Sequence, residues 1–186
     1  MKKIIFTTLS IVILILSGCA SSNKVSHASL KFDSTEKLPA SITPVEVISD
    51  LKPHAIKISE SISAHIATKS NGAGFFELVQ IAGEENEKFA ISVMARCDCL
   101  GFRKRGPGVS ALVIDQSGNI ISSMLRSNLG TVGLHGSFSS NGPHYIVLIA
   151  EETAVGELVL RVGDSYNGFV DVSGALDGTV IVRRFQ

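Results

Sequence analysis

The sequence predicts an all-β fold: a single β-sandwich or jelly roll that follows an N-terminal lipoprotein signal peptide and a flexible tether. Hydrophobicity alternates with a period of two over residues 88–96, as in a half-buried strand. Residues 109–114 and 144–150 are apolar on both faces, as in central strands. Turn residues that tolerate positive φ separate such segments: Asn71-Gly72, Ser117-Gly118-Asn119, Asn141-Gly142, Asn167-Gly168 and Asp177-Gly178. Short strands with frequent turns are typical of sandwiches and jelly rolls.

One stretch leaves the type of element open. Residues 151–162 fit either a short helix or a strand. Gly156 weakens both assignments, because glycine is unfavourable inside either element. No internal repeat is visible along the chain.

The N-terminus has the organisation of a secretory signal. Lys2 and Lys3 precede a run of 13 mostly apolar residues, 4–16, which is shorter than the ~20 that a membrane-spanning helix needs. Leu16-Ser17-Gly18-Cys19 matches the lipobox of bacterial lipoproteins. We therefore expect residues 1–18 to be removed and the Cys19 thiol to carry diacylglycerol.

Lipidation at Cys19 predicts stable membrane anchoring, since a single acyl chain binds only marginally and lipoproteins carry two or three. Ala20 follows the cysteine, where an aspartate would retain an enteric-type lipoprotein in the inner membrane. We expect the protein at the outer membrane, facing the periplasm. Residues 19–41 are Ser-rich and without steady period, which predicts a tether, and the sandwich domain is expected over residues 42–186.

Charge and motifs exclude several functions. The 17 basic residues balance the 17 acidic ones, and Lys2 and Lys3 leave with the signal peptide, so nucleic acid is not an expected partner. The chain lacks a G-x-S-x-G elbow, an H-E-x-x-H helix, a Walker loop and a calcium loop. Gly163-Asp164-Ser165 resembles the GDS-type esterase signature. That signature belongs near the start of an α/β domain, whereas here it lies near the C-terminus of a chain predicted to be all-β. We expect no catalytic residues and no cofactor.

Cys97 and Cys99 leave three interpretations open. A disulfide requires the chain to turn around Asp98, because a continuing strand would hold the two residues ~6.6 Å apart, whereas a bridge needs Cβ atoms about 4 Å apart. Two reduced thiols are the next alternative, and a metal or redox pair is the third. Zinc needs three or four protein ligands, and no histidine is near in sequence.

The scattered histidines give no metal motif. His135 and His144 flank the turn at Asn141-Gly142, where they would face each other across two strands, but no carboxylate stands at motif spacing. We expect structural roles for them and no metal site.

Arg103, Lys104 and Arg105 form a compact basic cluster. The cluster fits a solvated loop tip, or a docking site for an anionic component of the envelope whose binding would weaken with salt.

Several blocks resemble the maltose operon periplasmic protein family: Gly74–Leu78, Val109–Asn119, Gly136–Ser139, His144–Ile149 running into Glu151–Thr153, and Leu176–Val182. The likeness spans roughly residues 40–186. The Asp-x-x-Gly turn and Gly-x-x-Tyr strand are also similar to pre-peptidase C-terminal jelly-roll domains. The lipobox and the Cys97-Asp98-Cys99 segment depart from the maltose operon pattern.

The resemblance implies a non-catalytic envelope protein linked to carbohydrate uptake. We therefore expect an accessory or binding module, with maltodextrin or another envelope glycan as ligand. Carbohydrate sites usually offer an aromatic platform, so the expected contacts are Tyr145 and Tyr166, with Phe75, Phe76, Phe102 or Phe138 as substitutes. The absence of Trp counts against a sugar site. The alternative is a structural or assembly lipoprotein that binds a protein partner of the envelope.

Overall fold

The computed structural model describes residues 31–33, 42–68, 72–99, 104–124, 130–164 and 168–185. Cys19, Phe102, Arg103 and Tyr166 lie outside this part of the chain. The elements in chain order are β1 (Lys31–Asp33), β2 (Glu46–Ile48), β3 (His54–Ile58), β4 (Ala64–Thr68), β5 (Gly72–Gly83), β6 (Lys88–Arg96), β7 (Arg105–Pro107), β8 (Val109–Ile114), β9 (Ile120–Met124), β10 (Thr131–Ser137), β11 (Gly142–Glu151), the 3₁₀ turn η1 (Glu152–Ala154), β12 (Leu158–Asp164), β13 (Gly168–Ala175) and β14 (Gly178–Phe185).

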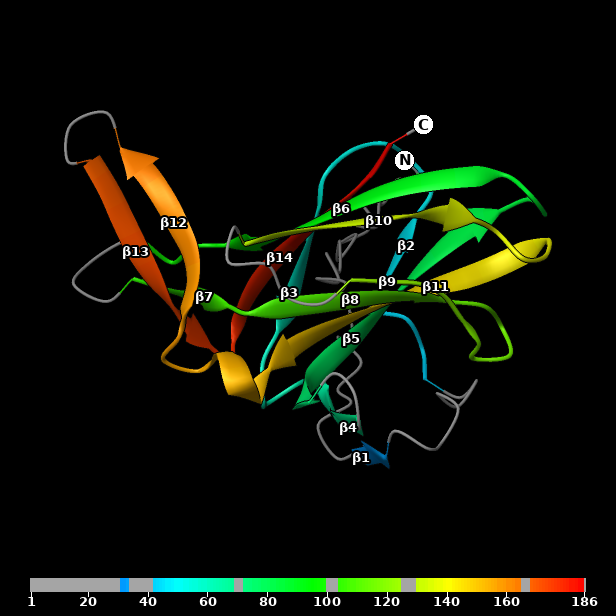
Figure 1. Cartoon of the computed structure of the whole chain (residues 1–186). Coiled ribbons are helices and arrows are strands. Elements are labelled where there is room, and N and C mark those ends of the chain that lie inside the picture. Colours follow the sequence, from blue (N-terminus) through cyan, green and yellow to red (C-terminus); the bar gives the residue numbers. More distant parts are fainter. Residues whose placement is uncertain are drawn as a thin grey trace, which may run out of the picture.

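The strands form two facing sheets and a third, smaller one (Figure 1). The first sheet has the order β1-β4-β5-β11-β8-β9, with β2 also paired to β5. The second has the order β10-β6-β14-β3, and the third β12-β13-β7. The predicted all-β sandwich is confirmed. Among the described residues, no helix has the length and apolar character to cross a membrane.

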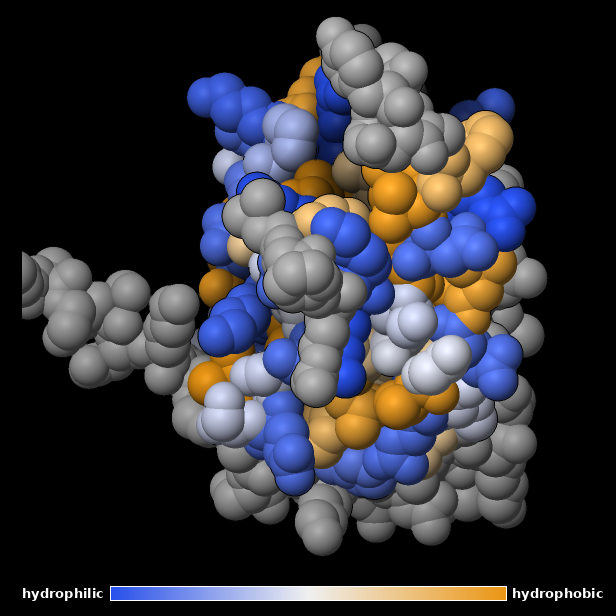
Figure 2. Space-filling view, turned by 90° about the vertical axis from the view of Figure 1, so that its left-hand side faces the viewer, coloured by the Kyte–Doolittle hydropathy of each residue, from blue (hydrophilic) through white to orange (hydrophobic). Residues whose placement is uncertain are grey.

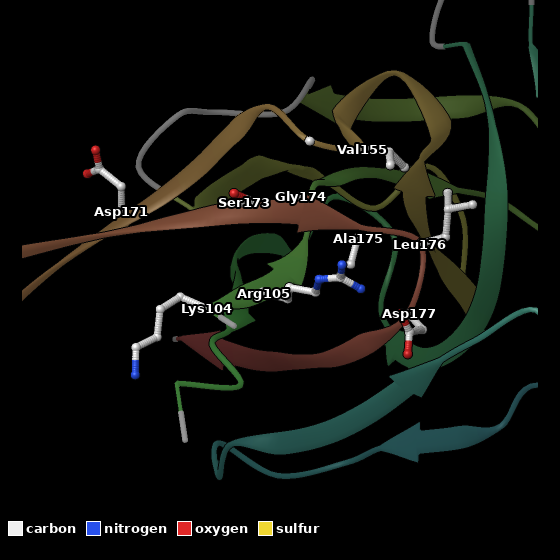
Figure 3. Close-up of a pocket in the computed structure, with 10 residues that line it drawn as sticks. Lys104, Arg105, Val155, Asp171, Ser173, Gly174, Ala175, Leu176 and Asp177 are labelled. Carbon is white, nitrogen blue, oxygen red and sulfur yellow. The ribbon is translucent and has the colours of Figure 1, made fainter. Parts of the chain in front are cut away.

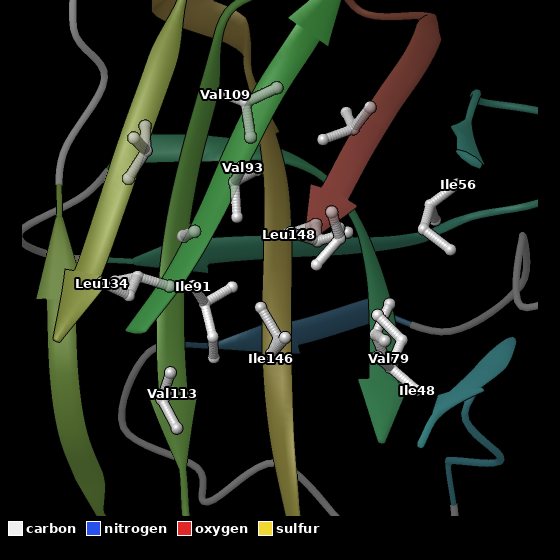
Figure 4. Packing of buried hydrophobic residues seen from close by; sticks show 14 of the residues in the cluster. Ile48, Ile56, Val79, Ile91, Val93, Val109, Val113, Leu134, Ile146 and Leu148 are labelled. Atoms are coloured by element: carbon white, nitrogen blue, oxygen red, sulfur yellow. The ribbon is translucent and has the colours of Figure 1, made fainter. Parts of the chain in front are cut away.

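The main core fills the space between the two larger sheets. In β6 the inward residues Phe89, Ile91, Val93 and Ala95 are buried, as their alternation predicts. Side chains of β8 and β11 project toward them from the opposite sheet (Figure 4). Non-directional burial of these aliphatic groups is what holds the two sheets together.

A second apolar cluster lies on the other face of the larger sheet. It includes Phe76, Leu112, Val147 and Ile149, all at most 5% exposed. This cluster explains why β8 and β11 are apolar on both faces. All the buried members of the hydrophobic clusters lie between residues 42 and 182, so a chain without its first 18 residues retains them.

The segment whose type the sequence left open contains two elements. β11 ends at Glu151, η1 follows, and Gly156 turns the chain at φ 81° into β12. The segment expected to be a tether, residues 19–41, contains β1, which pairs in parallel with β4.

The hairpin between β8 and β9 is closed by the carboxylate of Asp115. This side chain accepts hydrogen bonds from the backbone N–H groups of Ser117 and Asn119, both at 2.8 Å, and from Asn119 Nδ2 at 2.7 Å. Gly118 supplies the positive φ of 79°. Desolvation acts to raise the pKa of Asp115, but these hydrogen bonds outweigh it, so the pKa lies below its ordinary value.

Candidate ligand-binding site

The third sheet projects from one end of the sandwich (Figure 1). Its hairpin, β12 and β13, is antiparallel, and β7 adds to β13 in parallel. The inner face packs on a small core of Ala154, Val159 and Val172, next to the half-buried Cys97 and Cys99. The outer face of the sheet remains open to solvent.

A disulfide joins Cys97 and Cys99, whose Cα atoms are 5.2 Å apart. The chain turns there, because Asp98 leaves the β6 ladder and forms an antiparallel bridge with Arg105. The N–H of Asp98 donates to the Arg105 carbonyl at 2.8 Å, and Lys104 Nζ donates to the Cys99 carbonyl. The disulfide therefore closes the turn that places Asp98 opposite Arg105.

An open cleft of about 700 Å³ lies beside β7 and β13, and it is lined by Lys104, Arg105, Val155, Gly156, Asp171, Ser173, Gly174, Ala175, Leu176 and Asp177. The Arg105 guanidinium points into the space between Ala175 and Asp177 (Figure 3). Among the described residues neither Arg105 nor Asp177 forms an ion pair. A donor and an acceptor thus face the same space and are available to a ligand.

Phe169 lies on the same face of β13 as Asp171 and Ser173, since alternate residues of a strand share a face. It is 75% exposed. The side of its ring lies against Gly163 on the neighbouring strand, where a Cβ would be 3.5 Å from Cε1. That distance is an ordinary van der Waals contact, so the ring lies across the hairpin on the backbone of Gly163.

Arg161 forms an ion pair with Asp171, which lines the cleft and is two residues from Phe169. Arg161 Nε donates to Asp171 Oδ1 at 2.6 Å and Arg161 Nη2 to Asp171 Oδ2 at 3.1 Å. The hydrogen bonds from Arg161 lower the pKa of Asp171. Both groups are exposed, so the pair orients side chains more than it stabilises the fold.

The hairpin end of the molecule mixes hydrophobic and hydrophilic surface (Figure 2). Exposed apolar side chains there include Val155, Leu158 and Phe169. They alternate with charged groups and do not form a single apolar surface. Such a surface suits a ligand with both polar and apolar faces.

The structure places the predicted site residues in different regions. Lys104 and Arg105 line the cleft. Tyr145 is in the larger sheet and packs against its second apolar cluster, away from the cleft. Sequence reasoning missed Phe169 and Asp171. The Asn167-Gly168 turn was the signal for this hairpin, and its register sets Phe169 opposite Gly163.

The expectation that His135 and His144 face each other is wrong. β10 pairs with β6, whereas β11 pairs with β5 and β8, so the two residues belong to different sheets. His144 is buried, with its ring centroid 4.5 Å from that of Phe138, and His135 is exposed. Within the described ranges, no group of three or more His, Cys, Asp or Glu residues is arranged to hold a metal ion.

Comparison with known proteins identifies no family for this chain. No protein-family model matches the chain. No curated protein matches it either. Among solved structures, the chain is similar to the pre-peptidase C-terminal domain of collagenase from Bacillus anthracis, at 11% identity and a TM-score of 0.39, over 78% of this chain and 99% of that one. So distant a likeness carries no functional argument.

Proposed function

We propose that the chain is a non-catalytic binding module of the cell envelope, lipid-anchored at the outer membrane through Cys19, that binds a glycan at the cleft of the third sheet. The observation that carries the proposal is the mixed surface of the third sheet, where an exposed aromatic ring on β13 shares a face with Asp171 and Ser173, which line the cleft. Phe169 offers an exposed ring, and Arg105 and Asp177 offer a donor and an acceptor without partners among the described residues.

This combination suits the chemistry of a sugar. A pyranose has an apolar C–H face that packs on an aromatic ring, and hydroxyl groups that both donate and accept hydrogen bonds. In an oligosaccharide that spans the hairpin and the cleft, Phe169 supports the first contact with one sugar unit, and Arg105 and Asp177 support the second with another. A volume of about 700 Å³ is in the range of small-molecule sites. Phe169 takes the role that sequence reasoning assigned to Tyr145 and Tyr166.

The resemblance to the maltose operon family makes maltodextrin, and a link to its transport, the first proposal to test. Peptidoglycan fragments are the second ligand class. The test is calorimetric titration of residues 19–186 carrying Cys19→Ser, so that no lipid is attached. We expect saturable binding of one glycan class. No heat with any of these glycans at millimolar concentration contradicts the proposal.

Variants locate the site. Phe169→Ala should weaken glycan binding roughly fivefold, as expected for ~1 kcal/mol from an aromatic contact. Phe185→Ala is the matched control, because Phe185 is also exposed, at 42%, and lies in a different sheet. Asp177→Asn and Arg105→Gln should each weaken binding without changing the unfolding temperature. Equal effects of the two phenylalanine variants would exclude the cleft as the site.

The alternative function is assembly through a protein partner. Strand β12 is the edge of the third sheet, and Val155 and Leu158 beside it are 53% and 39% exposed. An edge strand of this kind supports pairing with a strand of another protein. Crosslinking from Leu158→Cys in whole cells tests this alternative, which predicts a single protein adduct.

A further inference from the structure

The charged side chains on the outer face of the four-stranded sheet are all basic. Its residues point away from the main core, because the alternate residues Val93, Leu134 and Val180 are buried inside it. We call this surface the basic face. Its members are Ala55 and Lys57 of β3, Thr179, Ile181, Arg183 and Phe185 of β14, Lys88, Ala90, Ser92, Met94 and Arg96 of β6, and Thr131, Gly133, His135 and Ser137 of β10.

The strand register spaces four cations across this face. Lys57 and Arg96 flank Thr179 at one end, Arg183 lies beside Ser92, and Lys88 is at the other end beside Ser137. Lys88 and Arg96 are separated by roughly 26 Å at ~3.3 Å per residue. The cations therefore cover the length of the sheet.

No member of the basic face is acidic. Strands β3, β6, β10 and β14 contain no Asp or Glu, and Glu87, Asp98 and Asp177 lie just beyond their ends. Among the described residues, Lys57, Lys88, Arg96 and Arg183 form no ion pair. In a chain with 17 basic and 17 acidic residues, this separation of charge gives the face a positive potential.

Apolar side chains occupy the space between the cations. Met94 and Phe185 are 44% and 42% exposed, and Ile181, beside Met94, is half-buried. The Arg183 guanidinium carbon lies 5.0 Å from the centroid of the Phe185 ring. A hollow of about 460 Å³ opens at Lys88 and His135. The surface thus combines exposed hydrophobic groups with unpaired positive charge.

We propose that the basic face binds an anionic lipid bilayer. Cations near an anionic membrane contribute about 1 kcal/mol each, and exposed Phe and Met side chains add apolar contact at the headgroup boundary. Charge without apolar groups would suit a soluble polyanion equally well, and Met94 and Phe185 favour the membrane. The face belongs to another sheet than the proposed glycan cleft. The basic face can bind lipid without the anchor, although an anchor at Cys19 would raise the local concentration of lipid.

The test is co-sedimentation of residues 19–186, with Cys19→Ser, with phosphatidylcholine vesicles that contain or lack phosphatidylglycerol. We expect binding to the anionic vesicles, loss at high salt, and little binding to phosphatidylcholine alone. Lys57→Gln with Arg96→Gln should lower the partition coefficient about 30-fold, which corresponds to two charges. Lys52→Gln is the control, because Lys52 lies beside Asp50.

Phe185→Ala should also weaken vesicle binding, whereas Phe169→Ala should not. Unfolding temperatures of all variants are measured to show that they are folded. Equal binding to both kinds of vesicle, or no effect of the paired Lys57 and Arg96 substitutions, overturns the proposal. So does binding to dextran sulfate without binding to vesicles, which assigns the face to an acidic polymer.

Discussion

Replacing Leu148 by alanine tests the packing of the sandwich most directly. Leu148 lies in β11, between β5 and β8, and is fully buried in the main core. The change removes three carbon atoms, about 2.4 kcal/mol of transfer free energy at ~0.8 per group. The cavity left between two rigid sheets adds to this cost, and we expect a loss of about 3–4 kcal/mol in the free energy of unfolding.

Urea unfolding followed by circular dichroism measures this loss. With a slope of about 2 kcal/mol/M, the midpoint should fall by roughly 1.5–2 M while the slope stays constant. Leu158→Ala is the matched control, since Leu158 is 39% exposed and should cost less than about 1 kcal/mol. If Leu148→Ala unfolds the protein outright, Leu148→Val, at about 1 kcal/mol, keeps the measurement possible. Similar losses for Leu148→Ala and Leu158→Ala would refute the packing described here.

Three further predictions concern local features. A Cβ on Gly174 would lie 1.8 Å from a backbone oxygen, whereas a Cβ on Gly156, at a φ of 81°, would meet open space. Gly174→Ala should therefore lower the unfolding temperature more than Gly156→Ala. Equal effects of the two substitutions would contradict this close approach. Asp115→Ala should destabilise the protein at pH 7, because a pKa held below its ordinary value of 3.8 contributes stability above that value and loses it as the pH falls through the folded-state pKa. Urea unfolding at pH 7 and pH 2 checks this, and a deficit that does not shrink in acid would count against it. Reduction of the Cys97–Cys99 disulfide should cost no more than about 2 kcal/mol, because the ring it closes is so short, and unfolding with and without reductant measures the difference.

The strands of the sandwich were predictable because local periodicity reports burial. The alternation over residues 88–96 corresponds to β6, and the apolar segments at 109–114 and 144–150 are the central strands β8 and β11. The third sheet was not predictable in the same way. Strands β7 and β13 pair in parallel across some 68 residues, and three-residue strands such as β7 give no periodic signal.

The site was predictable only in part. Lys104 and Arg105 stand out as a charged cluster in the sequence, and both line the cleft. Asp177 stands out in the sequence only as part of a turn, and nothing local distinguishes Phe169 from the other phenylalanines. Their role depends on long-range pairing, which sets Phe169 over Gly163 and brings the residues after β13 close to β7. Tyr145 attracted attention for its residue type, but its strand is central and its neighbours are apolar.

The position of β14 has a consequence for how the chain is made. This last strand is not at an edge: it pairs with β6 on one side and with β3 on the other. β3 therefore has no partner in its sheet until residues 178–185 have left the ribosome. Synthesis proceeds from the N-terminus, so the four-stranded sheet is completed only after residue 185 has been made. Until then β3 and β6 lack the strand that joins them, so the main core cannot form between two complete sheets.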